Sequence, residues 1–122
     1  MRAITALHIA VFVFGFVAGA VGMTAETNAV RDAFEKRCGG CHGVDTSKEG
    51  PALRGVVGRR AGRQPSFPYS DALKAAAFDW DAATLDRWLT DPDRVAPGTD
   101  MAFRLENKEE RARIIAYLEQ LK

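Results

Sequence analysis

Residues 38–42 of this 122-residue chain read Cys-Gly-Gly-Cys-His, and this short segment constrains the fold more than any other. Two thiols at this spacing, followed directly by a histidine, are the attachment signature of a c-type haem. The thiols can add to the vinyl groups on one edge of a porphyrin. His42 is then held beneath the ring with an imidazole nitrogen facing the iron. Because so short a motif can occur by chance, the rest of the chain has to supply independent support.

Other uses of Cys38 and Cys41 fit the chain less well. A structural zinc site takes four cysteine or histidine ligands, and this cluster offers fewer. A thioredoxin-like redox pair is expected beside a βαβ pattern, whereas helical and glycine-rich segments flank this motif. A single disulfide is common in small exported domains, but two cysteines this close beside a histidine favour haem.

The N-terminal end is typical of a secretory signal peptide. Met1-Arg2 give a positive start, residues 3–21 are almost entirely apolar, and small residues follow up to Ala25. We predict a signal peptide over residues 1–25 and one domain over residues 26–122, exported to the bacterial periplasm. Because the apolar run is long enough to cross a bilayer, an uncleaved membrane anchor facing the periplasm is the alternative.

The charge balance of the predicted domain limits its partners. The whole chain carries 17 Lys and Arg against 16 Asp and Glu. Residues 1–25 contain Arg2 and no acid, so the remaining residues balance in formal charge. Nucleic acid requires a basic footprint on the protein, and a neutral domain lacks one.

The supply of ligands matches a low-spin haem c, which needs two thioether sulfurs, one imidazole and one further axial ligand. Without residues 1–25, the chain retains two cysteines, one histidine (His42) and one methionine (Met101). A lone methionine usually fills a gap in an apolar core. Met101, however, lies in a loop with Pro97 and Gly98, where a core filler has little purpose. We therefore expect the Met101 thioether to be the second axial ligand.

The hydrophobic periodicity predicts an all-α domain, with roughly four short helices and no strand of any length. The first helix is expected over residues 28–37, capped by Asn28, and leads directly into the cysteine motif. Two further helices are expected over residues 71–78 and 82–90.

The end signals are clearest for the last two helices. Asp81 is the expected N-cap of the third helix, and Pro92 is its expected stop. Asn107 and Glu110 form an Asn-x-x-Glu capping box that opens the last helix. Short helices with long glycine-rich connections bury little apolar surface at this size. A covalently held porphyrin is therefore expected to supply part of the core.

With these residues in view, the chain resembles class I c-type cytochromes, most closely the mitochondrial cytochrome c and bacterial cytochrome c2 branch. The resemblance implies the cytochrome c fold, in which four or five short helices and long loops wrap around one covalently attached haem. The matching segments occur in the family's order and cover nearly the whole predicted domain: residues 38–42, 50–55, 58–62, 67–72, Trp80, 97–103 and 114–118.

The resemblance implies a role for each candidate site residue. Cys38 and Cys41 resemble the thioether attachments, and His42 and Met101 resemble the axial ligands. The carbonyl of Pro51 would accept the second imidazole N–H and fix the ring. The other candidates resemble residues that contact the haem propionates or, for the last, the aromatic beside the exposed haem edge: Arg59, Tyr69, Trp80, Thr99 and Phe103.

Several positions depart from the family pattern. Val30 stands where the first and last helices usually meet at a glycine, and Leu73 replaces an asparagine of the haem-side water network. Trp88 stands where the family has a tyrosine that hydrogen-bonds the methionine sulfur, and an indole N–H can donate instead. The lysines that surround the haem edge in the family are few here. We therefore expect association rates with partners to depend only modestly on salt.

The resemblance implies a one-electron carrier and not an enzyme. Its expected partners are a bc1-type quinol-oxidising complex or a dehydrogenase, and a terminal oxidase or photosynthetic reaction centre. A monomer is expected, with membrane contact only through partners or an uncleaved N-terminal segment. The alternatives are a haem relay subunit dedicated to one dehydrogenase, or a five-coordinate haem enzyme or sensor. Met101 argues against the last, because its thioether would fill the open iron site.

Overall fold

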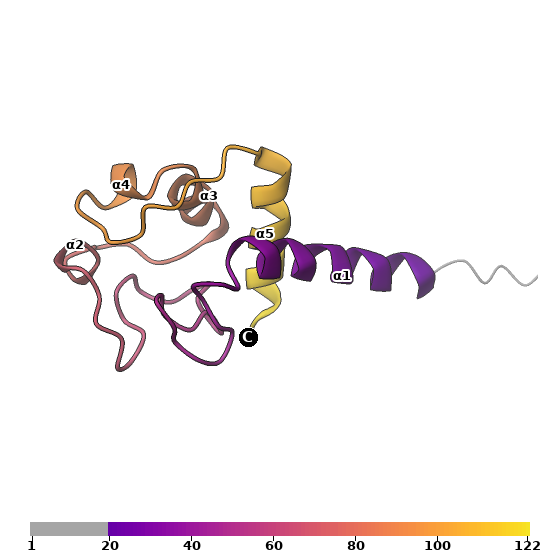
Figure 1. The fold of residues 1–122 in the computed structure, drawn as a ribbon, viewed down its shortest axis with the longest axis horizontal. Coiled ribbons are helices and arrows are strands. Elements are labelled where there is room, and N and C mark those ends of the chain that lie inside the picture. Colours follow the sequence, from indigo (N-terminus) through magenta and orange to yellow (C-terminus); the bar gives the residue numbers. More distant parts are fainter. Residues whose placement is uncertain (1–19) are drawn as a thin grey trace, which may run out of the picture.

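The structure is a computed structural model that describes residues 20–122, with side chains described from Thr24 onward (Figure 1). Residues 1–19 of the signal peptide predicted over residues 1–25 lie outside these residues. Within the described residues there is no strand, and two isolated β-bridges are the only β pairing. The all-α prediction is therefore confirmed. Residues 20–122 form five helices: α1 (Ala20–Arg37), α2 (Asp71–Lys74), α3 (Ala82–Thr90), α4 (Pro92–Val95) and α5 (Lys108–Gln120).

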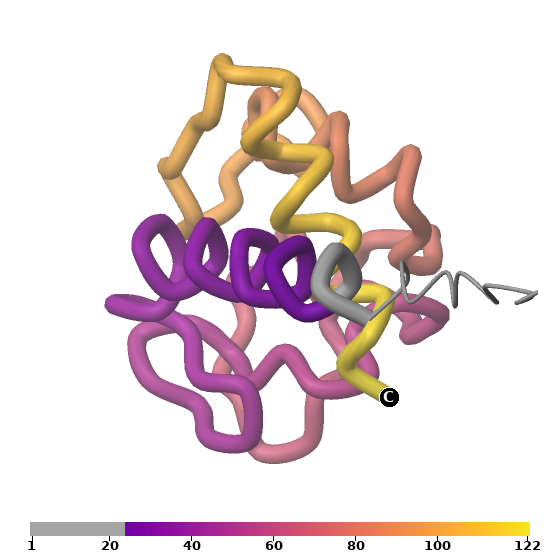
Figure 2. The backbone as a smooth tube through the Cα atoms, turned by 90° about the vertical axis from the view of Figure 1, so that its right-hand side faces the viewer, coloured from indigo at the N-terminus to yellow at the C-terminus, as the bar shows by residue number. Residues whose placement is uncertain are grey.

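Helices α1 and α5, from opposite ends of the domain, cross one another and pack together on one side of the molecule (Figure 1, Figure 2). The rings of Phe34 and Tyr117 lie 5.0 Å apart between centroids at this crossing. Phe34 and Ile114 are fully buried, and each such side chain contributes about 1.5–3 kcal/mol through removal from water. The crossing therefore fixes the chain that leaves α1 relative to α5.

Helix α1 differs from its prediction at its N-terminal end. It already includes Ala20, so Asn28 is an exposed residue inside the helix and does not cap it. No proline separates the two positions, so helical backbone continues upstream through residues that tolerate it. Among the described helices, none is long and apolar enough to cross a lipid bilayer.

Helix α2 is shorter than the predicted segment of residues 71–78. Ser70 caps it by accepting a hydrogen bond from the Leu73 amide, but the helix ends at Lys74. Beyond it, the Phe78 carbonyl accepts from the amide of Ala61 at 3.0 Å. This contact draws the chain away from a helical path, so tertiary pairing overrides the helical propensity of the alanines.

Helix α3 has the predicted bounds, and its N-cap is confirmed. The carboxylate of Asp81 accepts a hydrogen bond from the Thr84 amide at 2.6 Å. Pro92 does not act as a simple stop, because it opens the unpredicted helix α4. Proline suits the first turn of a helix, where its missing N–H costs no hydrogen bond.

Helix α5 begins at its predicted cap, but the capping box is only half formed. Asn107 Oδ1 accepts from the Glu110 amide at 2.8 Å. The Glu110 carboxylate instead accepts two hydrogen bonds from the Arg37 guanidinium, at 2.6 and 3.0 Å. Arg37 is the last residue of α1, so this ion pair ties the end of α1 to the start of α5.

Candidate haem-binding site

One cavity of about 590 Å³ lies between the helices and the long loops, and its lining contains the whole predicted site. This volume is within the range of about 300–1,000 Å³ that is usual for ligand pockets. The sequence-predicted residues on its wall are Cys38, Cys41, His42, Pro51, Arg59, Tyr69, Trp80, Thr99, Met101 and Phe103. Residues spread over most of the domain therefore meet at a single place.

The cysteine motif forms a tight turn directly after α1. The amide of Cys38 donates to the Phe34 carbonyl at 2.7 Å, which extends the helical pattern by one residue. The amides of Cys41 and His42 both donate to the Cys38 carbonyl, at 3.0 and 2.8 Å. The turn brings both thiols and the imidazole to the same cavity wall, with Cys38 buried and Cys41 exposed.

The imidazole of His42 has a defined orientation. Its Nδ1 lies 2.9 Å from the carbonyl oxygen of Pro51. A carbonyl only accepts, so Nδ1 carries the proton and Nε2 keeps its lone pair for a metal. Burial lowers the pKa of His42, which favours the neutral ring that binds iron. Gly50 packs so closely on this ring that a methyl group there would collide with it.

Neither thiol has the lowered pKa that is typical of a redox-active cysteine. Burial raises the pKa of Cys38 to about 12. A hydrogen bond from Cys41 Sγ to the Glu49 carboxylate raises the pKa of Cys41. A reactive redox cysteine has a lowered pKa instead. These raised pKa values therefore disfavour the thioredoxin-like interpretation of the motif.

Met101 reaches the cavity from the loop between α4 and α5, here called the Met101 loop (residues 97–107). Its Sδ accepts a hydrogen bond from the indole Nε1 of Trp88 at 3.1 Å. Trp88 is buried on α3 and also lines the cavity. Trp88, which stands where the family has a tyrosine, thus also supplies a hydrogen-bond donor to the methionine sulfur. Its spacing on α3 with Leu85 and Leu89 marks it as buried, but only the structure shows where the N–H points.

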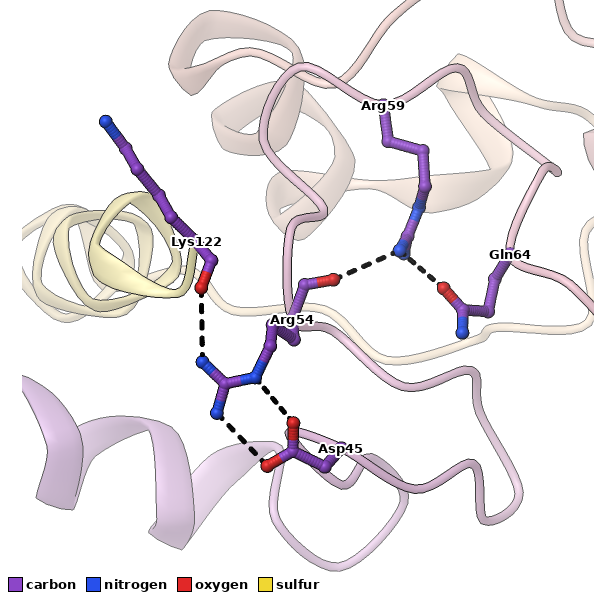
Figure 3. A network of polar contacts seen from close by, with 5 residues as sticks. All are labelled: Asp45, Arg54, Arg59, Gln64 and Lys122. Atoms are coloured by element: carbon purple, nitrogen blue, oxygen red, sulfur yellow. Dashed lines mark hydrogen bonds and ion pairs between the residues drawn. The ribbon is translucent and has the colours of Figure 1, made fainter.

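Arg59 and Tyr69 line the cavity and share a polar network through Gln64, and Figure 3 shows the part of it between Arg59 and Gln64. The Arg59 guanidinium donates to the Gln64 side-chain oxygen and to the carbonyls of Arg54 and Ala52. The Tyr69 hydroxyl accepts a hydrogen bond from the backbone amide of Gln64 at 3.1 Å. Burial lowers the pKa of Arg59, although not enough to remove its charge near neutral pH. The role of Gln64 was not predicted from the sequence, because no periodic pattern or motif marks this residue.

A second ion pair secures the loop that carries Pro51. Arg54 binds Asp45 through two guanidinium nitrogens and donates to the Lys122 carbonyl at 3.3 Å (Figure 3). The amide of Gly55 also donates to the carbonyl of Leu121 at 2.6 Å. The segment that orients His42 is therefore held by the C-terminal end of the chain.

The remaining predicted residues complete the wall. The rings of Trp80 and Trp88 meet edge to face with centroids 5.1 Å apart. The Thr99 hydroxyl lies 3.5 Å from the backbone amide of Met101. Phe103, two residues after Met101, is half-buried. Leu73 also lines the cavity and is half-buried, which makes this part of the wall apolar.

The residues present fit a covalently attached haem. The donor set comprises two thiols on one turn, an oriented neutral imidazole and a thioether, all on one cavity. The guanidinium and phenol groups offer partners for acidic substituents, which are costly to bury unpaired. An all-α shell around such a site defines a c-type haem protein.

Comparison with known proteins agrees with this class. The family model described as cytochrome c matches residues 28–122. A cytochrome c2 of Rhodomicrobium vannielii is 46% identical over 87 residues, which cover 68% of this chain and 70% of that protein. A cytochrome c of Euglena viridis is 45% identical over 94 residues, covering 73% of this chain and 90% of that protein.

Solved structures give the same answer. Cytochrome cH from Methylobacterium extorquens superposes with a TM-score of 0.72 at 40% identity, over 77% of this chain and 97% of that one. The ferricytochrome c2 of Rhodopseudomonas palustris gives a TM-score of 0.71 at 34% identity, over 79% and 98%. The chain belongs to the cytochrome c family and has its fold. It is a small c-type cytochrome, an electron carrier with one haem c bound covalently through Cys38 and Cys41.

Proposed function

We propose that this electron carrier holds its haem iron between His42 and Met101 and cycles between Fe(II) and Fe(III) with both ligands kept. One observation carries the proposal: both thiols, one oriented imidazole and one thioether line a single cavity. The haem supplies the one-electron chemistry, and the chain binds and orients it.

The two axial residues have different electronic effects. The Pro51 carbonyl accepts from His42 Nδ1, which increases the basicity of the nitrogen that faces the iron. A thioether favours the reduced ion, so Met101 raises the reduction potential. The Trp88 indole donates to the same sulfur and makes it a still weaker electron donor to Fe(III). We therefore expect a fairly high potential.

The other wall residues hold the haem without reacting. Arg59, Tyr69, Trp80 and Thr99 line the cavity, and we assign them to propionate binding, as the resemblance implies; Leu85 and Leu89 of α3 make the apolar part of the wall. A rigid, dry site changes little when the iron changes charge. Phe103 is half-buried on the same wall, consistent with a haem edge that reaches the surface there.

The oxidised spectrum tests the ligation. A His/Met-ligated haem c shows a weak absorption band near the red edge of the visible spectrum. We expect this band in the oxidised wild type and its loss in Met101→Ala. A wild type that lacks the band would refute Met101 as the ligand.

We further propose that the protein works in the bacterial periplasm. The basic start, the apolar run and the small residues up to Ala25 support export behind a cleaved signal peptide. N-terminal sequencing combined with the intact mass of the exported protein tests this, because it reports the cleavage position and the added mass of one haem together. An intact Met1 in the exported protein would favour the anchored alternative.

The partners we propose are a quinol-oxidising complex or dehydrogenase as donor, and an oxidase or reaction centre as acceptor. Charges of both signs lie around the Met101 loop, with Asp100 and Glu106 beside Arg104 and Lys108. Long-range steering by such a mixed surface is weak. Association rates should therefore fall modestly between low and high salt, and a steep fall would contradict this description of the docking face.

A further inference from the structure

Arg111 on α5 is a buried cation with an unusual set of partners. Among the residues whose side chains are described, it is the one charged residue that is buried, with 8% of its surface exposed. Its Nε donates to Asp86 Oδ1 at 2.8 Å. Its Nη1 donates to the carbonyls of Leu105 and Glu106, at 2.8 and 2.9 Å. A buried guanidinium is stable only when it is paired in this way.

These partners connect three parts of the molecule. Asp86 lies on α3, whereas Leu105 and Glu106 lie at the end of the Met101 loop. The amide of Leu105 donates to the Leu89 carbonyl at 2.8 Å, which ties the same loop end to α3 a second time. Arg111 therefore holds α5, α3 and the end of the Met101 loop in one arrangement.

The middle of the loop has little support of its own. Among backbone amides of the described residues 100–104, the one hydrogen bond to protein runs from Met101 to the Thr99 hydroxyl, and at 3.5 Å it is long. The Arg104–Asp91 ion pair nearby is solvent-exposed on the arginine side, and such pairs are weak. The position of Met101 is therefore set largely by the loop ends and by Trp88.

We infer that Arg111, paired with Asp86, is a positioning residue that keeps the Met101 thioether over the cavity. The inference rests on the proposed role of Met101 as an axial ligand. Without the guanidinium, two carbonyls at the loop end lose their partner, and Leu105 is buried. The loop would then open more often, although neither Arg111 nor Asp86 lines the cavity.

Competition by added imidazole measures this opening in the intact oxidised protein. Imidazole can bind the iron only while Met101 is displaced, so its apparent Kd is inversely proportional to the open fraction. Arg111→Gln removes hydrogen bonds from a charged group, so we expect about tenfold tighter apparent imidazole binding. Asp86→Ala should tighten binding by a smaller factor, and Arg111→Lys should lie between wild type and Arg111→Gln.

Arg54→Gln is the matched control, because Arg54 also joins an acidic residue and a backbone carbonyl but on the His42 side. It should lower thermal stability and leave the imidazole Kd unchanged. The inference is wrong if Arg111→Gln and Asp86→Ala bind imidazole as wild type does, or if Arg54→Gln tightens binding equally. Should Arg111→Gln fail to fold, Asp86→Ala decides. Absence of the red absorption band from oxidised wild type would instead overturn the proposed ligation, and with it this inference.

Discussion

The His42 side and the Met101 side of the cavity are built in different ways. His42 follows α1 within a hydrogen-bonded turn, and its ring is fixed by the Pro51 carbonyl and by close packing on Gly50. Met101 lies in a loop whose middle has few backbone hydrogen bonds, and its sulfur is fixed by Trp88 from another helix.

Because of this difference, the His42 side holds the haem permanently, whereas the ligand on the Met101 side can be exchanged. The His42 ring is oriented by residues close in sequence, on a loop that the C-terminal end holds, and this side is backed by two thioethers. The Met101 side is determined by distant residues, so it can yield while the rest of the protein stays folded. Substitutions on the His42 side should therefore damage the whole molecule, whereas those on the Met101 side should alter ligand exchange and potential.

The largest contrast is expected between His42→Ala and Met101→Ala. His42→Ala removes the ligand that the turn and the Pro51 contact exist to orient, so little folded holoprotein should accumulate. Met101→Ala should retain the covalent haem and its helix content. Haem absorbance per protein and far-ultraviolet circular dichroism measure both outcomes. Equal yields of the two variants would remove the proposed difference between the sides.

Two glycines sharpen the comparison. Gly50→Ala places a methyl group against the His42 ring, and such overpacking costs roughly 1–3 kcal/mol or more. Gly98→Ala on the Met101 loop meets no atom within 4 Å, but φ is 87° there, which costs about 1–2 kcal/mol. Urea unfolding gives both values. Only Gly50→Ala should also shift the main haem absorption band, and a shift in Gly98→Ala alone would reverse our assignment.

Trp88→Phe keeps an aromatic ring and removes the N–H that donates to Met101 Sδ. The sulfur then donates more strongly to Fe(III), so the reduction potential should fall by up to about 40 mV. Voltammetry measures the shift. Tyr117→Phe, an aromatic change at the α1–α5 crossing, should leave the potential unchanged. A potential that rises in Trp88→Phe would show that the hydrogen bond does not weaken electron donation from the Met101 sulfur to Fe(III).

The smallest effect concerns the ion pair of Arg37 and Glu110 beside the cysteine turn. The hydrogen bond from Arg37 lowers the pKa of Glu110 in the folded protein. A lowered carboxyl pKa adds stability above the unfolded pKa, and this stability is lost as pH falls through the folded pKa. The stability difference between wild type and Glu110→Gln should therefore be constant near neutral pH and shrink below about pH 4. Acid and urea titrations check this, and a difference that grows on acidification would contradict it.

Local signals predicted much of the fold. The caps Asp81 and Asn107 define the starts of α3 and α5, because a side chain and the amides it caps are neighbours in sequence. The end of α2 was not predictable in this way. It depends on the bond between Ala61 and Phe78, which are far apart in the chain. Helix α4 was missed although Pro92 could have marked it, since proline opens helices as well as ending them.

The candidate site shows the same contrast between features with a local sequence signal and features that depend on distant contacts. The cysteine motif and the resemblance identified the cavity residues, and all of them lie on one wall or another of that cavity. The partners Gln64, Asp86 and Glu49 carry no sequence signal, since each acts through a contact with a distant or irregular segment. Which residues could touch a haem was therefore predictable, whereas what holds those residues in place was not.

Carbon monoxide binding to the reduced protein tests the central claim most directly, because it asks whether the side of the iron opposite His42 is closed by Met101. We predict that reduced wild type shows no spectral change under carbon monoxide, while reduced Met101→Ala binds it stoichiometrically. Ready binding to wild type, at the level seen in Met101→Ala, would contradict a closed site and the electron-carrier mechanism built on it.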